Sequence, residues 1–377
     1  MVDVEGELTP PETGGAAMAG GAVRLRLRPS VETVRAPDGD LLIVRGGTRA
    51  TEAIPDPRPD DLALIDALAG GWRTVAELEA RFGDVRGALA ALDGNRMLEW
   101  RAAPGASPLA ADRLERFDRQ LPYFADVLPD RSPEEVQRSL AERHVAVLGC
   151  GGLGSWAVQA LALSGIGRLT LIDPDTVELS NLNRQALYGT ADVGRRKVVA
   201  ARESVARLDA EIEVHVVERA VASPEDAVRA LGGADVVIQT ADSPPYELER
   251  WVNRACVQLG TPHISAAQQP PLLRIGPFVI PGRTACYACQ EEAARREYPL
   301  YDALVAERRR RPSVAATLGV ASGVIGTMLA TEALHHLVGL TPPTAGAALM
   351  LDLLTWAVEW ERFERDPSCP VCTAQGI

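Results

Sequence analysis

Hydrophobic and polar positions alternate one for one near the N-terminus, in the run VRLRLRP that begins at Val23. A two-residue period predicts a strand with one buried face. The next stretch, TVRAPDGDLLIVRG, predicts two short strands around Asp38-Gly39, a dipeptide typical of hairpin turns. Three helix-like pieces follow, DDLALIDALAG, TVAELEARFG and VRGALAALDG, and then a short strand-like run, RMLEW. This order of elements predicts a small α+β winged-helix domain over residues 22–102.

The segments on either side of this domain lack such periodicity. Residues 1–21 are rich in glycine, proline, alanine and acidic residues, which is typical of a disordered tail. Residues 103–112 contain the stretch APGASPLAA, and we expect this small-residue segment to be a linker. A second domain over residues 113–377 accounts for the remaining length, as expected for a chain of 377 residues.

The second domain contains a fully apolar run, HVAVLG, followed by a glycine-rich turn and the helix-like stretch GSWAVQALALSGIG. The run RLTLID is then the next strand. This strand, turn, helix and strand predict the start of a doubly wound, Rossmann-like α/β sheet. Gly149, Gly151 and Gly154 form a GxGxxG pattern, and Asp173 ends the second strand, where a ribose hydroxyl would be bound. By this pattern alone, a dinucleotide-dependent dehydrogenase would be the usual interpretation.

The residues that follow Asp173 favour a triphosphate instead. Several polar and basic side chains come directly after the ribose acid: Asn183, Arg184, Gln185 and Lys197. Arginine and lysine beside a phosphate loop supply charge-assisted contacts to a triphosphate and to the charge that develops when a phosphate leaves. Each of these residues also has a plain structural interpretation as a surface charge on a loop or helix.

A further carboxylate is expected at the same edge of the sheet. The run ADVVIQTADS predicts another buried strand that ends at Asp242. A carboxylate at the C-terminal edge of such a sheet is placed to help hold Mg2+. The alternative is that Asp242 caps the segment that follows it.

Four of the six cysteines fall into the pairs CYAC and CPVC: Cys286, Cys289, Cys369 and Cys372. In a reducing compartment, two CxxC pairs predict a closed, tetrahedral four-cysteine zinc site. Two unrelated pairs of buried thiols, or redox chemistry at one pair, are the alternatives. The N-terminus has no basic segment followed by an apolar one, and no apolar run reaches about 18 residues. We therefore expect no signal peptide, no membrane span and a cytoplasmic location.

The charge distribution argues against nucleic acid as a partner. The net charge of −12 is spread along the chain without a long basic tract. Residues 22–105 contain 12 basic and 13 acidic side chains, so the predicted winged helix lacks a basic recognition helix. An exposed edge strand beside a helix can dock an extended peptide by strand addition. We expect peptide binding by this domain, with a structural or dimerising role as the alternative.

The set GCGGLGS, LIDPDTVELSNLNRQ, GRRKV and TADS, with GPFVIPGRTACYAC and the late CPVC, resembles the ubiquitin-activating-like adenylyltransferase family that includes ThiF, MoeB and MccB. The resemblance covers residues 113–377. It implies an enzyme that uses ATP and Mg2+ to adenylate the C-terminal carboxylate of a small protein or peptide, with release of pyrophosphate. The element FDRQ resembles a family motif whose arginine reaches into the partner subunit's site, which implies a catalytic role for Arg119 and a homodimer.

The resemblance also implies a role for each residue of the nucleotide site. The glycine turn would line the nucleotide and Asp173 would bind the ribose. Asp242 would bind Mg2+. The glycines that line the nucleotide turn would be Gly149, Gly151, Gly152 and Gly154. The residues that surround the phosphates would be Asn183, Arg184, Gln185 and Lys197.

Two departures from the family pattern change the expected chemistry. Ser243 follows Asp242 where an amide is typical, and the segment after the first cysteine pair, QEEAARREYPLYDALVAERRRRPSVAAT, contains no cysteine. Since Cys150 and Cys256 are expected to be structural, a thioester intermediate is disfavoured. The adenylate would then be attacked directly or passed to another protein. We expect this segment to be a loop, in which Arg308, Arg309, Arg310 and Arg311 form either a solvated face or a flap over the substrate.

The first domain resembles the PqqD-like leader-recognition element of enzymes that mature ribosomally made peptides. Joined to an MccB-like half, it implies an enzyme that binds a precursor peptide through its leader and adenylates a carboxylate of the core peptide. Two alternatives stay open. One is activation of a ubiquitin-like sulfur-carrier protein, and the other is a non-catalytic, leader-binding partner of a cyclodehydratase.

Overall fold

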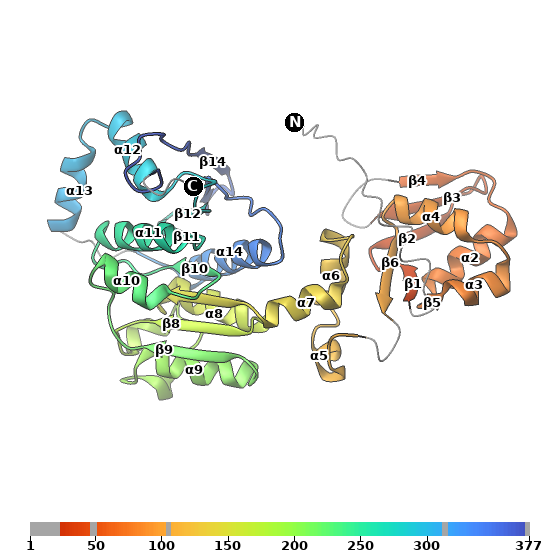
Figure 1. Cartoon of the computed structure of the whole chain (residues 1–377), viewed down its shortest axis with the longest axis horizontal. Coiled ribbons are helices and arrows are strands. Elements are labelled where there is room, and N and C mark those ends of the chain that lie inside the picture. Colours follow the sequence, from red (N-terminus) through yellow and green to blue (C-terminus); the bar gives the residue numbers. More distant parts are fainter. Residues whose placement is uncertain (1–22, 46–50, 103–106, 311–315, 374–377) are drawn as a thin grey trace. The chain divides into compact units, whose positions relative to one another are not determined.

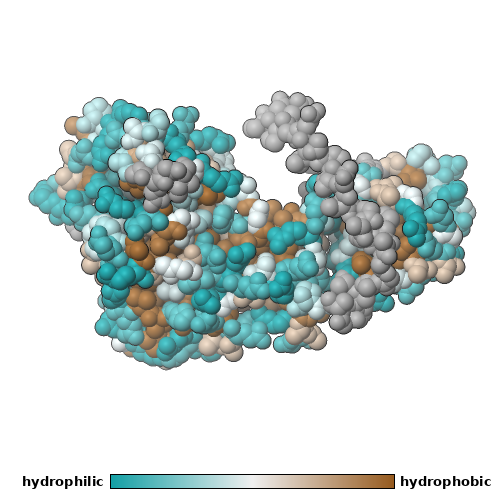
Figure 2. Space-filling model, viewed as in Figure 1, coloured by the Kyte–Doolittle hydropathy of each residue, from teal (hydrophilic) through white to brown (hydrophobic). Residues whose placement is uncertain are grey.

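The computed structural model of the chain describes residues 23–45, 51–102, 107–310 and 316–373. The predicted tail, residues 1–21, lies outside this part. The chain divides into two compact units, Met1–Arg138 and Ser139–Ile377, whose elements are labelled in Figure 1. None of the helices in the described ranges has the length and apolarity needed to cross a bilayer. Figure 2 shows mostly hydrophilic residues on the visible surface, with smaller groups of hydrophobic residues among them.

The described residues of the first unit up to Ala102 form two small antiparallel sheets and three short helices. One sheet has the strand order β5-β1-β6 and the other β2-β3-β4. The elements are β1 (Val23–Leu27), β2 (Val31–Arg35), β3 (Leu41–Arg45), β4 (Thr51–Ile54), α2 (Pro59–Ala69), β5 (Arg73–Thr74), α3 (Val75–Phe82), α4 (Arg86–Gly94) and β6 (Leu98–Ala102). The predicted strands, helices and hairpin are confirmed, and Gly39 in the hairpin turn has a φ of +99°. The winged-helix assignment itself stays a prediction.

Local sequence explains these helices and their packing. In α3, Thr74 accepts a hydrogen bond from the N–H of Glu77, and the Glu77 carboxylate accepts one from the N–H of Thr74. This capping box satisfies donors that a helix start leaves unpaired. Leu25 and Leu98 from the sheet are fully buried, as is Leu68 from α2. The alternating pattern of the first strand therefore places its leucines in a shared core.

Three more helices belong to the first unit in whole or in part: α5 (Ala111–Arg116), α6 (Gln120–Val127) and α7 (Pro133–Ala141). The buried guanidinium of Arg28 donates to the Ala125 carbonyl, and Ser30 donates to Asp126 over 3.0 Å. Arg101 pairs with the fully buried Glu134 of α7. The boundary between compact units falls within α7, later than the domain boundary predicted at residue 113.

The second unit is built on an eight-stranded sheet with the order β14-β13-β12-β11-β10-β7-β8-β9. Strands β11, β10, β7, β8 and β9 are parallel, whereas β12, β13 and β14 extend the sheet antiparallel. The strands are β7 (His144–Leu148), β8 (Arg168–Ile172), β9 (Glu213–Val217), β10 (Val236–Gln239), β11 (His263–Gln269), β12 (Leu272–Val279), β13 (Ala347–Asp352) and β14 (Val358–Arg362). The Rossmann-like class is confirmed, and the antiparallel extension was not predicted.

Helices cover both faces of the parallel part (Figure 1). Helices α8 (Gly152–Leu163) and α14 (Gly319–Leu337) pack against each other, and α9 (Lys197–Leu208) contacts α8. On the other face, α10 (Pro224–Leu231) and α11 (Glu247–Leu259) pack on alternate residues of β7, Ala146 and Leu148. Strand β7 is buried along its whole length, as expected for a parallel strand covered on both sides.

Candidate nucleotide and zinc sites

The glycine turn joins β7 to α8 with almost no space for side chains. A Cβ on Gly154 would stand 1.9 Å from the Gly149 carbonyl oxygen, and one on Gly149 would stand 2.6 Å from the Ala241 nitrogen. Gly149 also has a φ of +91°, which favours glycine. These contacts bring the first turn of α8 against the strand ends. The N–H groups at that helix start form the kind of site that binds phosphate.

Asp173 comes directly after β8 and holds the glycine turn in place. One carboxylate oxygen accepts the Cys150 N–H over 2.7 Å, and the other accepts the Asp175 N–H over 2.8 Å. Burial raises the pKa of Asp173, while the Lys197 ammonium and the two N–H donors oppose this shift. The carboxylate is therefore positioned beside the turn, and its predicted contact with a ribose stays a prediction.

The two predicted cations lie close to this turn. Lys197 is the first residue of α9, is largely buried and places its Nζ 2.8 Å from Asp175. Arg184 donates to the Ser180 carbonyl over 2.9 Å, and its side-chain stem lies 3.6 Å from where a Cβ on Gly152 would stand. The stem of Arg184 therefore borders the glycine turn, and the charge of Lys197 lowers the pKa values of Cys150 and Asp173 against the effect of burial. The roles of both residues toward phosphate stay predictions.

The two predicted amides differ in their surroundings. Gln185 is 5% exposed, and its Nε2 lies 3.9 Å from where a Cβ on Gly151 would stand. Its Oε1 is buried without a hydrogen-bond partner among the described residues. A buried polar atom without a partner is uncommon in a folded protein. This oxygen is therefore suited to accept a hydrogen bond from a ligand bound at the turn. Asn183 is exposed, and its Oδ1 accepts a bond from Arg184.

Asp242 lies three residues beyond the end of β10, at the same edge of the sheet. The prediction that this strand runs to Asp242 is wrong, because it ends at Gln239. Instead of continuing the strand, Thr240 donates to the Gly149 carbonyl over 2.7 Å, and Ala241 donates to that of Leu148 over 3.0 Å. The Asp242 carboxylate is exposed, so it is accessible to a cation.

The segment after the first cysteine pair is helical, so the prediction of a loop there is wrong. It forms α12 (Tyr287–Glu297) and α13 (Tyr301–Arg310), as expected from its alanine, glutamate and arginine content. Arg308 donates to the Tyr246 hydroxyl over 3.0 Å, Arg309 pairs with Glu247, and Arg310 pairs with Glu307. Arg311 lies outside the described residues.

Arg119 precedes α6 in the first unit. Its side chain is 95% exposed and lies 3.6 Å from the Asp118 carboxylate. It is therefore accessible, and its predicted role in a partner subunit's site stays a prediction.

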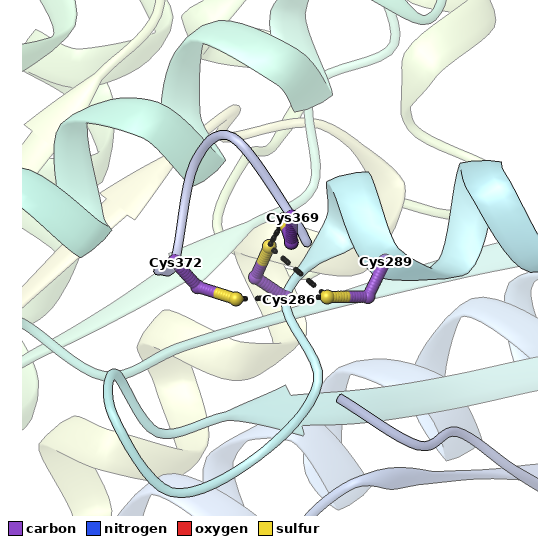
Figure 3. Close-up of side chains that lie close together, drawn as sticks. All are labelled: Cys286, Cys289, Cys369 and Cys372. Carbon is purple, nitrogen blue, oxygen red and sulfur yellow. Dashed lines mark hydrogen bonds between the residues drawn. The ribbon is translucent and has the colours of Figure 1, made fainter. Parts of the chain in front are cut away.

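The four cysteines of the two CxxC pairs meet in one buried cluster (Figure 3). Neighbouring sulfurs are 3.6, 3.7 and 3.9 Å apart, and all four are free thiols. A tetrahedron of thiolates about 2.3 Å from zinc has edges of about 3.8 Å, so the spacing fits this metal. The Asp366 N–H also donates to the Cys289 sulfur over 3.4 Å. The cluster is suited to a closed structural zinc site without an open position for substrate.

The two remaining cysteines are structural, as predicted. Cys150 in the glycine turn and Cys256 in α11 are both fully buried. Burial raises the pKa of each thiol. Since the thiolate is the reactive form, neither residue is suited to act as a nucleophile.

Several residues near the turn were missed by sequence reasoning. Ser322 of α14 is fully buried, and its Oγ lies 3.1 Å from where a Cβ on Gly152 would stand. The Tyr188 hydroxyl donates to the Cys150 carbonyl over 2.9 Å. The small-residue run GVASGVIG could have indicated that α14 packs closely on the site. Within this run, Gly326 permits close packing on Leu153.

A glycine turn at a helix start, basic side chains beside it and a four-cysteine cluster are suited to a nucleotide-binding protein with a structural metal site. The sequence profile of the ThiF family matches residues 118–371, and the chain belongs to this family. It is 33% identical to the sulfur carrier protein adenylyltransferase of Thermus thermophilus over 267 residues, which are 69% of this chain and 91% of that protein. It is also 33% identical to the adenylyltransferase and sulfurtransferase MOCS3 of Sus scrofa, over 84% of this chain. The chain spans only 65% of the length of that protein.

Among solved structures, the fold is similar to that of MccB from E. coli, determined with ATP. The TM-score is 0.74 at 24% sequence identity, and the match covers 93% of this chain and 99% of MccB. Another structure shows MccB, described as a microcin C7 biosynthetic enzyme, in complex with N-formylated MccA. At this level of identity, the likeness concerns the fold.

Proposed function

We propose that the chain uses ATP to adenylate a carboxylate of a ribosomally synthesised precursor peptide during natural-product maturation. The observation that carries this proposal is the additional folded domain ahead of the catalytic sheet. The fold likeness to MccB covers 93% of this chain and 99% of MccB, whereas the matches to the Thermus thermophilus enzyme and to MOCS3 cover 69% and 84% of this chain. A likeness that spans nearly the whole of both chains favours a peptide substrate over a carrier protein.

The first domain would bind the leader of the precursor as a PqqD-like element. In the sheet β2-β3-β4, the outer strands β2 and β4 each pair with β3 alone among the described strands. Strand β2 is also partly exposed along its length. An extended peptide can add a strand at such an edge, which raises the concentration of the core peptide near the active site. A homodimer would bring Arg119 of one subunit to the site of the other.

In the proposed reaction, a carboxylate oxygen of the peptide attacks the α-phosphorus of ATP, and the bond to the β-phosphate oxygen breaks. Pyrophosphate leaves with the electron pair, and the peptide becomes an acyl adenylate. Arg184 and Lys197 stabilise the charge on the phosphates, and Asp173 binds the ribose. Asp242 would hold Mg2+, which supplies further positive charge when bound. An amine, amide or thiol of another molecule then displaces AMP.

Substituting Lys197 tests this assignment. We expect Lys197→Ala to lower the rate of pyrophosphate exchange into ATP by about 100-fold, because it removes a cation from beside the phosphates. Arg202→Ala is the matched control, since Arg202 is exposed on the same helix. Full exchange activity in the Lys197 variant would refute its catalytic role.

The substrate is tested by exchange with a candidate precursor peptide, with and without its leader. We expect exchange that depends on the leader. Exchange stimulated by a folded sulfur carrier and indifferent to any leader would favour the carrier-activating alternative. Leader binding without exchange would instead indicate a non-catalytic partner of a cyclodehydratase.

A further inference from the structure

A small cavity lies in the second unit, among the end of β10, the start of β11, the end of β12 and the helices α11 and α12. Its volume is about 10 Å³. The lining includes five polar side chains: Gln239, Glu249, His263, Ser265 and Gln290. Gln239, His263 and Gln290 are 3%, 5% and 8% exposed. A polar cavity of this size is suited to one water molecule.

Two atoms that line this cavity lack partners. The Oε2 of Glu249 and the Nδ1 of His263 are buried, and neither has a hydrogen-bond partner within the described residues. Burial lowers the pKa of His263 to about 4, so its ring is neutral at physiological pH. Buried polar groups are nearly always hydrogen-bonded. A water molecule between the carboxylate and the imidazole would satisfy both.

Glu249 is the third residue of α11, and Tyr246 directly precedes this helix. A glutamate at that position is placed to accept a hydrogen bond from the backbone N–H of the cap residue. This is one half of a capping box. Tyr246 has a φ of +65°, a conformation that is uncommon for a tyrosine and requires support from its surroundings. Glu249 is placed to provide that support. Tyr246, the residue supported, lies four residues after Asp242.

The surroundings of Glu249 are otherwise acidic and apolar. Burial is the main cause that raises its pKa to about 6, and the charges of Asp242 and Glu291 add to the shift. Gln239, which lines the same cavity as Glu249, ends β10 three residues before Asp242. Glu291 is held by two hydrogen bonds from Arg250, of 2.8 and 2.9 Å. Tyr287 of α12 and His263 of β11 face the same cavity.

We infer that Glu249 is a positioning residue of the nucleotide site: it fixes the turn from Asp242 to Tyr246, and a bound water molecule joins its second oxygen to His263. The inference rests on the proposed function in one respect, the role of Asp242 as the Mg2+ ligand. Glu249 itself would touch neither ATP nor the metal ion.

The test compares Glu249→Ala and Glu249→Gln with the control Glu247→Gln, which changes a neighbouring carboxylate that pairs with Arg309. ATP affinity is measured by calorimetry across a series of Mg2+ concentrations, and KM and kcat are measured by pyrophosphate exchange. We expect Glu249→Ala to weaken Mg2+-dependent ATP binding about 10-fold, with a smaller change in kcat. Glu249→Gln keeps an oxygen for the Tyr246 N–H but carries no charge, so its affinity at pH 7.5 should lie between those of Glu249→Ala and the wild type.

The pH dependence of ATP affinity is a second measurement, and a merely structural role of Glu249 would not change it. The ionised carboxylate is the stronger acceptor. Wild-type affinity is therefore expected to fall as the pH drops through about 6, and Glu249→Gln should lack this step. Thermal unfolding of each variant shows whether it is folded. The inference is overturned if folded Glu249→Ala binds ATP as the Glu247→Gln control does at every pH.

The water molecule has its own test, a crystal structure of the wild-type protein at high resolution. A water within hydrogen-bond distance of both Glu249 and His263 is expected, and a dry cavity would contradict the inference. Calorimetry also separates the two proposals. If the wild type binds ATP with Mg2+ but exchanges no pyrophosphate with any peptide, the proposed function is wrong. The ATP affinities of the variants still test the role of Glu249 in that case.

Discussion

Gly154→Ala is expected to abolish ATP binding and to destabilise the second unit. The added Cβ would stand 1.9 Å from the Gly149 carbonyl oxygen and 2.8 Å from the Thr240 hydroxyl oxygen. The first neighbour is backbone, and its oxygen already accepts the Thr240 hydroxyl over 2.7 Å. Helix α8 would have to move away from β7, which would distort the phosphate-binding turn. Overpacking of this kind costs about 3 kcal/mol or more.

The measurements are thermal unfolding and calorimetric titration with ATP. For a unit of this size we expect Tm to fall by roughly 10 °C. Gly151→Ala is the matched control, because the nearest neighbour of its Cβ would be the Gln185 amide nitrogen at 3.9 Å and its φ is −77°. The control should keep the wild-type Tm within about 2 °C. The same Tm and ATP affinity in both variants would show that the close approach is not required.

Serine substitution of both Cys369 and Cys372 is expected to remove one bound zinc per chain and to lower Tm more than any other change considered. Structural zinc contributes about 10–16 kcal/mol in zinc-finger peptides at neutral pH, so its loss exceeds the stability of most domains. The effect should extend beyond the cluster, because Cys286 is the N-cap residue of α12. Its Tyr287 N–H donates to Asn253 of α11 over 2.9 Å.

Metal content by mass spectrometry and thermal unfolding provide the measurement. Cys256→Ala is the control, since Cys256 is a fully buried cysteine outside the cluster. It should keep one zinc per chain and lose only the small stability expected of a minor cavity. Wild-type protein that is fully stable without metal, or that contains a disulfide between these cysteines, would contradict the zinc assignment.

The parts of the site that could be predicted are those set by local geometry. The GxGxxG spacing specifies a turn in which Gly154 must lie against Gly149, and two CxxC pairs each present two thiols at a fixed separation. Asp173 follows from its place directly after an apolar strand. In each case the prediction depends only on a few residues that are close together in the sequence.

The parts that could not be predicted depend on contacts between distant segments. Nothing near Gln239 in the sequence indicates that Thr240 leaves the strand to bond with Gly149. The cavity beside Glu249 likewise combines residues of five elements, each of which is ordinary when taken alone. The prediction of a loop over α12 and α13 followed the family pattern, although the alanine, glutamate and arginine content there favours helices.

The two halves of the cysteine cluster also constrain the unfolded chain. Cys286 and Cys369 are 83 residues apart, and the segment between them contains α12, α13, α14, β13 and β14. A metal that stayed bound to both pairs would close this segment into a ring and remove conformational freedom before any of it had folded. A covalent link around a loop of this length reduces chain entropy by an amount worth about 4–5 kcal/mol. The tether would hold β13 and β14 close to Cys286 and hence to β12, which ends seven residues before it, so β13 would have a far smaller volume to search for β12.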